Sequence, residues 1–265
     1  MNKVHIKYIS LHKNKVIYFL PIIIIMIIAG YFIYFNALLF DEGHDHTHSK
    51  DELRSLTLEE EPVSPEDGVN TKGYHIHVNL DNKQMYVYKD GKFIKSYPCS
   101  GGHTLTPSPT GSWKIIDKGE WGDGFGGAWM GLNVPWGDYG IHGTVYPWVV
   151  GKYNVSAGCI RMYSKDAMEL YKYIPYGTTV TIVHENSPFR TMLSGDVGSD
   201  IRDLQISLSK LGYYKGSPDG VFGDFLKMAV EDFQKDNKIY CTGKVDKKTL
   251  EILKNMVMEY ENSNQ

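Results

Sequence analysis

Cysteine is scarce in this chain of 265 residues, which contains only Cys99, Cys159 and Cys241. Three cysteines cannot form a fully paired disulfide framework. A bridge between Cys99 and Cys241 fits the count, but nothing else in the sequence supports it. A large excess of one charge is also absent, because the formal net charge is −3, so we expect no nucleic-acid partner. The length suits one substantial domain plus a small one, and the 42% hydrophobic fraction allows most of the chain to fold.

The N-terminal region lacks acidic residues over 1–15 and lacks any charge over 16–35. A helix of the second segment would span about 30 Å, the thickness of the hydrocarbon core of a bilayer. A cleaved signal peptide is the alternative, but its apolar core would be shorter, and residues 36–40 offer no good cleavage site. The lysines all precede the apolar segment. We therefore expect a cytoplasmic segment at 1–15, an uncleaved transmembrane anchor at 16–35, and the rest of the chain outside the cell membrane.

Residues 36–70 are poor in apolar side chains and carry ten acidic residues against Lys50 and Arg54. Such a segment repels itself and does not bury enough surface to order. A small cluster, His44 to His48, is also compatible with binding a transition metal, but a solvated spacer is the favoured interpretation. We expect no metal and no cofactor.

Residues 71–186 show a pattern typical of a mainly β domain. Apolar residues alternate with polar ones over 76–80 and 85–88, and Asp90-Gly91 is a hairpin signal, so an antiparallel meander is predicted. Further strands are predicted at 113–116 and 178–184. One helix is predicted after Ser164, its expected N-cap, because apolar residues recur at helical spacing as far as Ile174.

Two residues in this domain suggest nucleophilic catalysis, namely His142 and Cys159. An imidazole that titrates near neutral pH is well suited to take the proton of a thiol. Gly143 and Gly158 allow close approach of two backbone segments, and the N–H groups of Gly158 and Cys159 are candidates to stabilise an oxyanion. The alternative is a buried structural cysteine and an unrelated histidine.

The surrounding sequence favours catalysis. Residues 141–144 (Ile-His-Gly-Thr) and 156–162 (Ser-Ala-Gly-Cys-Ile-Arg-Met) resemble the L,D-transpeptidase (YkuD) catalytic family, whose signature is a His-Gly, a spacer and a Ser-His-Gly-Cys-hydrophobic-Arg block. The small-residue turn at 100–102 and the Thr-Pro segment from Thr106 to Gly111 extend the resemblance. One position departs from it, since Ala157 stands where the family usually has a second histidine.

The resemblance implies an L,D-transpeptidase-like β-sandwich or barrel with one helix. It also implies a thioester on Cys159, 3→3 cross-links between peptidoglycan stem peptides, and sensitivity to carbapenems. In the resulting hypothesis, His142 is the base, the Gly143 carbonyl orients it, and Ser156 shapes the turn. Arg161 binds a substrate carboxylate or, as the alternative, forms a structural ion pair.

Residues 119–140 are rich in glycine and aromatic residues. A phosphate-binding loop at Gly124-Phe125-Gly126 is disfavoured because no helical pattern follows. We predict a mobile cover over the site, with Trp136 and Tyr139, together with Tyr146, binding substrate. Packing of the same rings in the core is the alternative for each.

Residues 187–195 are predicted to link this domain to a three-helix bundle at 196–258, a size near the lower limit for independent folding. Asp224 and Asp246 are expected to cap the second and third helices, and Phe225 is expected on the apolar face of the second. The segments around Leu204-Gln205, residues 219–223 and Phe233-Gln234 resemble the peptidoglycan-binding-domain family. The candidate contacts in this module are Tyr213, Tyr214 and Asp219.

Two other functions remain open. The same site with water as acceptor would make a carboxypeptidase that trims stem tetrapeptides, and a chain without activity would be a wall-binding membrane tether. A sortase is disfavoured, because no Thr-Leu-x-Thr-Cys run precedes Cys159. The expected partners are peptidoglycan stem peptides and glycan, together with the membrane. The sequence does not set the oligomeric state.

Overall fold

The computed structural model describes residues 72–264. The predictions for the cytoplasmic segment 1–15, the anchor 16–35 and the acidic spacer 36–70 lie outside this range. Among the described residues, no helix has both the length and the apolar character needed to cross a bilayer.

The first half of the sheet is the predicted meander. Strands β1 (Tyr74–Asn79), β2 (Gln84–Lys89) and β3 (Lys92–Pro98) are successive antiparallel neighbours. Ile76 pairs with Val87 and Val78 pairs with Met85, so these four apolar side chains share one face. All four are fully buried in the main core, as the alternating pattern of the sequence predicts.

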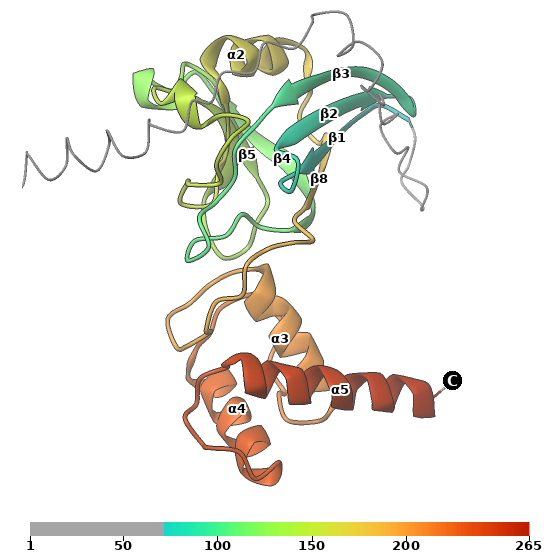
Figure 1. Ribbon diagram of the computed structural model, residues 1–265. Helices are drawn as coiled ribbons and strands as arrows, with labels where there is room; N and C mark the ends of the chain where they lie inside the picture. The colour runs from blue at the N-terminus through green and yellow to red at the C-terminus, as the bar shows by residue number, and fades with distance from the viewer. Residues whose placement is uncertain (1–71, 265) are drawn as a thin grey trace, which may run out of the picture. The chain divides into compact units, whose positions relative to one another are not determined.

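The rest of the sheet extends from β1 on its other side. β8 (Thr179–Val183) runs parallel to β1 and antiparallel to β4 (Gly111–Gly119), which is followed by β5 (Trp129–Leu132), β6 (Tyr139–Thr144) and β7 (Ile160–Tyr163). β6 and β7 are parallel. A bridge between Ser100, just beyond β3, and Arg161 in β7 brings the two ends of the sheet together. The domain is therefore mainly β and close to a barrel (Figure 1).

The predicted helix of this domain is α2 (Ser164–Tyr173), which packs against β6 and β7. Its Ala167 and Leu170 are fully buried in the core. The N-cap position is occupied by Tyr163 and not by Ser164, so the predicted cap was wrong. The hydroxyl of Ser164 instead donates to the carbonyl of Thr144, 3.2 Å away, because the helix begins directly against the end of β6.

The glycine-rich stretch 119–140 contains a strand that the sequence did not predict. β5 lies within it and pairs with β4 on one side and β6 on the other. All four of its residues are buried, so no polar and apolar alternation marks it as a strand. A short 3₁₀ turn, η1 (Asp123–Phe125), precedes it.

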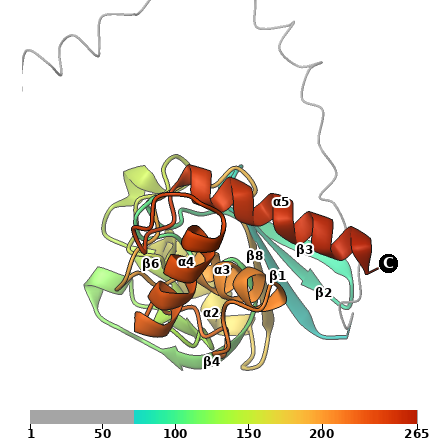
Figure 2. The same ribbon diagram turned by 90° about the horizontal axis from the view of Figure 1, so that it is seen from below.

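Residues 199–263 form the helices α3 (Ser199–Lys210), α4 (Asp224–Asp236) and α5 (Lys247–Ser263), shown from a second direction in Figure 2. Asp246 caps α5 as predicted, because its carboxylate accepts from the N–H of Thr249 at 2.8 Å. The predicted Asp224 cap was wrong, since Gly223 is the N-cap of α4. Phe225, assigned to the apolar face, is 82% exposed.

Two buried glutamines organise the turns of this helical region. The side chain of Gln205 accepts from the N–H of Gly220 and donates to the carbonyl of Val221. The side chain of Gln234 likewise accepts from the N–H of Gly243 and donates to the carbonyl of Lys244. In both cases a buried glutamine side chain forms hydrogen bonds to the backbone of the turn, once after α3 and once after α4.

Candidate active site

The register of β6 and β7 places the two candidate catalytic residues on one face of the sheet. His142 pairs with Arg161, and Cys159 lies two residues before Arg161. Side chains two residues apart in an extended segment point the same way. The alternate residues, Ile141 and Ile160, face the buried core instead. His142 and Cys159 therefore lie outside the core on the same face, as the hypothesis requires.

The indole of Trp129 forms part of this face. Trp129 pairs with His142 across β5 and β6, and its ring centroid is 5.9 Å from that of the imidazole. The ring lies over Gly131 and Gly140, because a Cβ atom at Gly140 would stand 2.6 Å from the indole. Its Nε1 donates to Asp117 at 3.0 Å. The two glycines leave the space that the indole needs.

More aromatic rings pack around the imidazole. Phe125 of η1 meets His142 at a centroid distance of 4.9 Å, and Trp121 stacks on Trp129 at 4.6 Å. His142 is only 5% exposed. This burial lowers the pKa of His142, and the positive charge of Arg161 adds to the effect. A neutral imidazole at pH 7 is the form that accepts a proton.

The backbone beside His142 orients the ring. Nδ1 of His142 lies 2.5 Å from the carbonyl oxygen of Gly143, so Nδ1 carries the proton and donates it to that acceptor. Nε2 is then left as the basic nitrogen. The geometry agrees with the orienting role predicted for Gly143.

The thiol of Cys159 is half-buried beside Asp138, four residues before His142 in the chain. Its Sγ lies 4.0 Å from the carbonyl oxygen of Asp138. Burial raises the pKa of Cys159, while a backbone hydrogen bond from Gly140 and the charge of Arg161 act in the opposite direction. The net direction is upward. In this state the thiol of Cys159 is therefore protonated and the imidazole of His142 is neutral.

The turn before Cys159 is held by Ser156. Its hydroxyl accepts from the N–H of Gly158 at 3.0 Å and donates to the carbonyl of Cys159 at 2.6 Å, as expected of a residue that shapes the turn. The N–H of Gly158, predicted from the sequence to stabilise an oxyanion, is occupied by its bond to Ser156, so that role requires the bond to break. Gly158 has φ +119°, and a Cβ there would lie 2.4 Å from the ring of Tyr139. Ala157 is exposed at the turn.

A second segment, residues 99–106, is joined by hydrogen bonds to the turn that precedes Cys159. Gly101 and Ser156 are joined by a backbone hydrogen bond of 2.9 Å, and the hydroxyl of Thr106 donates to Ser156 at the same distance. Asn154 accepts from the N–H of Gly101 and donates to the carbonyl of Leu80. Neither Asn154 nor Thr106 was predicted from the sequence as a residue that holds this turn. The only signal available was the resemblance of this segment to the family pattern.

The predicted substrate-binding residues fall into different environments. Arg161 is half-buried and takes part in none of the ion pairs formed within residues 72–264. Tyr146 is 49% exposed, whereas Tyr139 is half-buried beside Gly158. Trp136 is buried in the core, where it packs edge-on against Trp113 at 5.3 Å. Trp136 therefore has the core environment that was the alternative for it.

The other two cysteines are separate from this chemistry. All three cysteines are free, so the bridge between Cys99 and Cys241 is not formed. Cys99 is fully buried, and burial raises the pKa of its thiol to about 12. Cys241 is exposed in the helical region. Among the residues that the structure describes, no three His, Cys, Asp or Glu side chains gather to hold a metal ion.

The candidate wall contacts of the helical region make internal contacts. The Tyr213 ring packs on Phe233, and its hydroxyl donates to Asp236. Tyr214 is buried, and Asp219 accepts from the Gln205 side chain at 2.8 Å. A cavity of about 400 Å³ is lined by the two tyrosines together with residues that include Phe225, Met228 and Asp232.

Similarity to known protein families covers both folded regions of the chain. A family model of the L,D-transpeptidase catalytic domain matches residues 73–182, and a peptidoglycan binding domain model matches residues 197–253. The protein named L,D-transpeptidase YkuD from Bacillus licheniformis is 39% identical over 114 residues, which cover 43% of this chain and 67% of that protein. L,D-transpeptidase YqjB from Bacillus subtilis is 31% identical and is covered to 74%.

The chain belongs to the L,D-transpeptidase family. The YkuD protein of Bacillus subtilis is 43% identical over 110 residues, and the chain spans 65% of its length. Among solved structures, the L,D-transpeptidase from Mycobacterium smegmatis is 20% identical with a TM-score of 0.37, over 42% of this chain and 58% of that chain.

Proposed function

We propose that this L,D-transpeptidase family member forms 3→3 cross-links between peptidoglycan stem peptides through a thioester on Cys159. The observation that carries the proposal is the register of β6 and β7, which sets His142 and Cys159 on one face outside the core. The bond from Nδ1 of His142 to Gly143 supports it, because it leaves Nε2 as the base. No cofactor enters the reaction.

In the first step, Cys159 Sγ attacks the carbonyl carbon of the third residue of a stem tetrapeptide. His142 accepts the thiol proton as the sulfur–carbon bond forms. The C–N bond to the terminal D-alanine then breaks, and the proton passes to the departing amine. The N–H of Cys159 lies beside the carbon under attack and is our candidate oxyanion donor.

In the second step, the amine of another stem peptide attacks the thioester carbonyl. His142 takes the proton of the amine, the new amide forms, and the sulfur leaves as the thiol of Cys159. Each cycle joins two stem peptides and releases one D-alanine. The role in the cell would be cell wall biogenesis and the maintenance of cell shape.

Substrate contacts follow from charge and exposure. Arg161 shares the face of His142 and takes no part in the ion pairs of residues 72–264, which supports a contact with a substrate carboxylate. Exposed Tyr146 supports a contact with the donor peptide. In the helical region, the cavity beside Tyr213 and Phe225 supports a wall-binding site.

The location of the protein is part of the same proposal. The uncharged stretch 16–35 and the lysines before it support a single-pass anchor with its N-terminus in the cytoplasm. The acidic stretch 36–70 supports a spacer that holds the two folded regions at the wall.

Muropeptide analysis tests this function. We expect cells that overproduce the protein to gain 3→3 cross-linked dimers, the Cys159→Ala variant to gain none, and a Cys241→Ala control to match the unsubstituted protein. Trimmed tripeptides without new dimers would indicate a carboxypeptidase. Unchanged cross-linking by Cys159→Ala, combined with loss of function on deletion of residues 196–265, would indicate a tether.

A further inference from the structure

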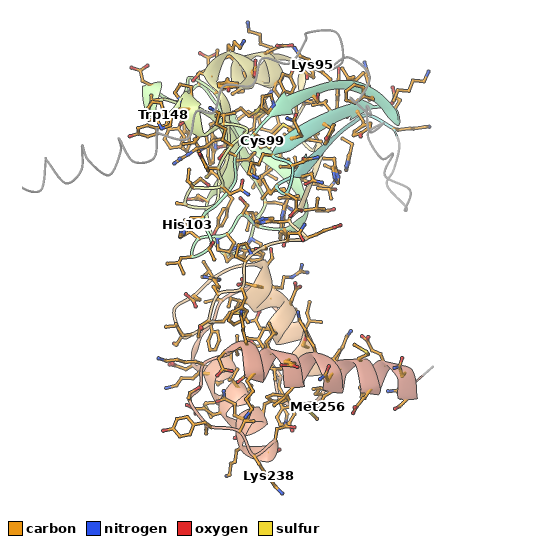
Figure 3. The ribbon with its side chains drawn as sticks, in the orientation of Figure 1. Lys95, Cys99, His103, Trp148, Lys238 and Met256 are labelled. Atoms are coloured by element: carbon orange, nitrogen blue, oxygen red, sulfur yellow. The ribbon has the colours of Figure 1, made fainter. Side chains whose placement is uncertain are left out.

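The segment between the two catalytic residues exposes an unusual amount of apolar surface. Five large apolar side chains of residues 145–155 are between 43% and 62% exposed: Val145, Tyr146, Trp148, Tyr153 and Val155. Figure 3 shows Trp148 at the left edge of the β domain. Exposed apolar side chains gathered in this way commonly mark a binding surface.

These side chains stand on a fixed segment. Tyr146 is the N-cap of the short turn η2 (Pro147–Val149), and its ring contacts the ring of Trp148, within that turn, edge-to-face with centroids 5.4 Å apart. Val150 is 2% exposed and anchors the segment, and the N–H of Gly151 donates to the carbonyl of Cys99 at 2.9 Å. The hydroxyl of Ser100 bonds the carbonyl of Tyr153. A surface held in place before binding loses little entropy when a ligand binds.

The position and charge of the segment narrow down its ligand. It starts three residues after His142 and ends before Ser156, so both of its ends are attached to the reactive site. Lys152 is the only charged residue between Thr144 and Cys159. Lipid-binding surfaces usually carry several basic residues, and recognition of a charged peptide needs opposite charges. This surface has neither.

Trp148 and Tyr153 are 62% and 61% exposed. Exposed, uncharged aromatic rings suit the C–H faces of a sugar ring, because the face of an aromatic ring carries partial negative charge. We propose that Trp148 and Tyr153 form a platform for the sugar rings of the glycan to which the stem peptide is attached. The proposal rests on the function proposed above and adds to it that the donor is recognised by its glycan as well as by its peptide.

The test compares two donors with the full-length protein: a free stem tetrapeptide and the same tetrapeptide carrying its disaccharide. The unsubstituted protein should have a higher kcat/KM for the sugar-bearing donor. Trp148→Ala and Tyr153→Ala should each lower the ratio of the two kcat/KM values about fivefold. Trp148→Phe, which keeps a ring, should retain most of the preference.

The matched control is Tyr176→Ala. Tyr176 is 61% exposed, as is Tyr153, but it lies in the turn between α2 and β8. Tyr176→Ala should leave the ratio of the two kcat/KM values unchanged. Formation of a carbapenem adduct at the normal rate shows that a variant is folded.

A ratio near one in the unsubstituted protein, or a ratio unaffected by Trp148→Ala and Tyr153→Ala, would overturn the platform while leaving the transpeptidase function intact. Binding of the Cys159→Ala protein to anionic phospholipid vesicles that depends on Trp148 would also overturn it, in favour of a lipid surface. Absence of acyl transfer from either donor would refute the proposed function, and the platform with it.

Discussion

His142 and Arg161 lie directly opposite one another on the parallel strands β6 and β7. This pairing brings the imidazole to the same face as Cys159, although a long connection separates the two residues in the chain. It also puts a guanidinium beside the imidazole, where its positive charge disfavours a second proton on the ring. The reactivity of the site should therefore follow the protonation of His142.

The pH dependence of acylation is the first prediction. The pKa of His142 is lowered from its ordinary value of 6.5, mainly by burial, so the ring stays neutral until the pH falls below that value. Carbapenem acylation should be nearly constant from pH 7 to 8 and should fall on the acid side with a midpoint below 6.5. Acylation rates measured from pH 5 to 9 give this midpoint. A midpoint above 6.5 would contradict the neutral imidazole.

The titration of the thiol is the second prediction. Burial raises the pKa of Cys159 from its ordinary value of 9.0, so the thiolate should be scarce at pH 7. Alkylation by iodoacetamide in a His142→Ala variant should keep rising as the pH passes 9. The modified cysteine is identified by peptide mass mapping, with the exposed Cys241 as the internal reference. A plateau at neutral pH would indicate a preformed thiolate.

The third prediction concerns the ring of Phe125, which contacts His142. Phe125→Ala should admit water to the imidazole and relieve its desolvation, so the acid midpoint of acylation should move up toward 6.5. The control is Phe93→Ala on β3, a ring that is 48% exposed and should leave the midpoint unchanged. An unchanged midpoint in Phe125→Ala would show that this ring does not keep water from His142.

The fourth prediction compares alanine substitutions at two glycines that both have a positive φ, Gly158 and Gly177. Gly158→Ala would place a Cβ against Tyr139 at a position with φ +119°, so the turn that carries Cys159 must shift, and acylation should slow about tenfold or more. Gly177 also has a positive φ, +78°, but nothing lies within 4 Å of its Cβ position. Gly177→Ala should lower stability by about 1 kcal/mol and leave acylation unchanged. Equal acylation rates in the two variants would contradict this account of the turn.

The fifth prediction concerns stability in the helical region. Gln205→Ala would leave the N–H of Gly220 without its partner and would remove one of the two hydrogen bonds that the carbonyl of Val221 accepts, the other coming from the N–H of Gly223; it should cost about 2 kcal/mol. Hydrogen exchange of the α3 and α4 amides should accelerate accordingly. Lys215→Ala, at an exposed position, should stay within about 0.5 kcal/mol of the unsubstituted protein. Equal exchange in both variants would show that the glutamine does not hold the turn.

Period-two and helical patterns predicted much of the fold. β1, β2 and β3 were predictable because Ile76 and Val78 alternate with polar neighbours, and α2 because Ala167 and Leu170 recur at helical spacing. The pairing of β6 with β7 was not predictable from any local pattern. It depends on a connection that is itself held by Cys99 and Ser100.

Local patterns failed where a residue's role depends on a distant partner. β5 was not predictable because Gly131 interrupts the strand pattern. A glycine stands there because a Cβ atom would crowd the indole of Trp129. Nothing in the sequence distinguishes Trp136, buried against Trp113, from Trp148, which is 62% exposed. The hydroxyl of Ser164 bonds a strand end instead of capping its own helix.

Intact-protein mass after incubation with a carbapenem tests the central claim most directly. The unsubstituted protein and Cys241→Ala should each gain one adduct, Cys159→Ala should gain none, and His142→Ala should gain it at least about a hundredfold more slowly. An undiminished adduct on Cys159→Ala, or an unchanged rate in His142→Ala, would contradict a reactive thiol served by this imidazole.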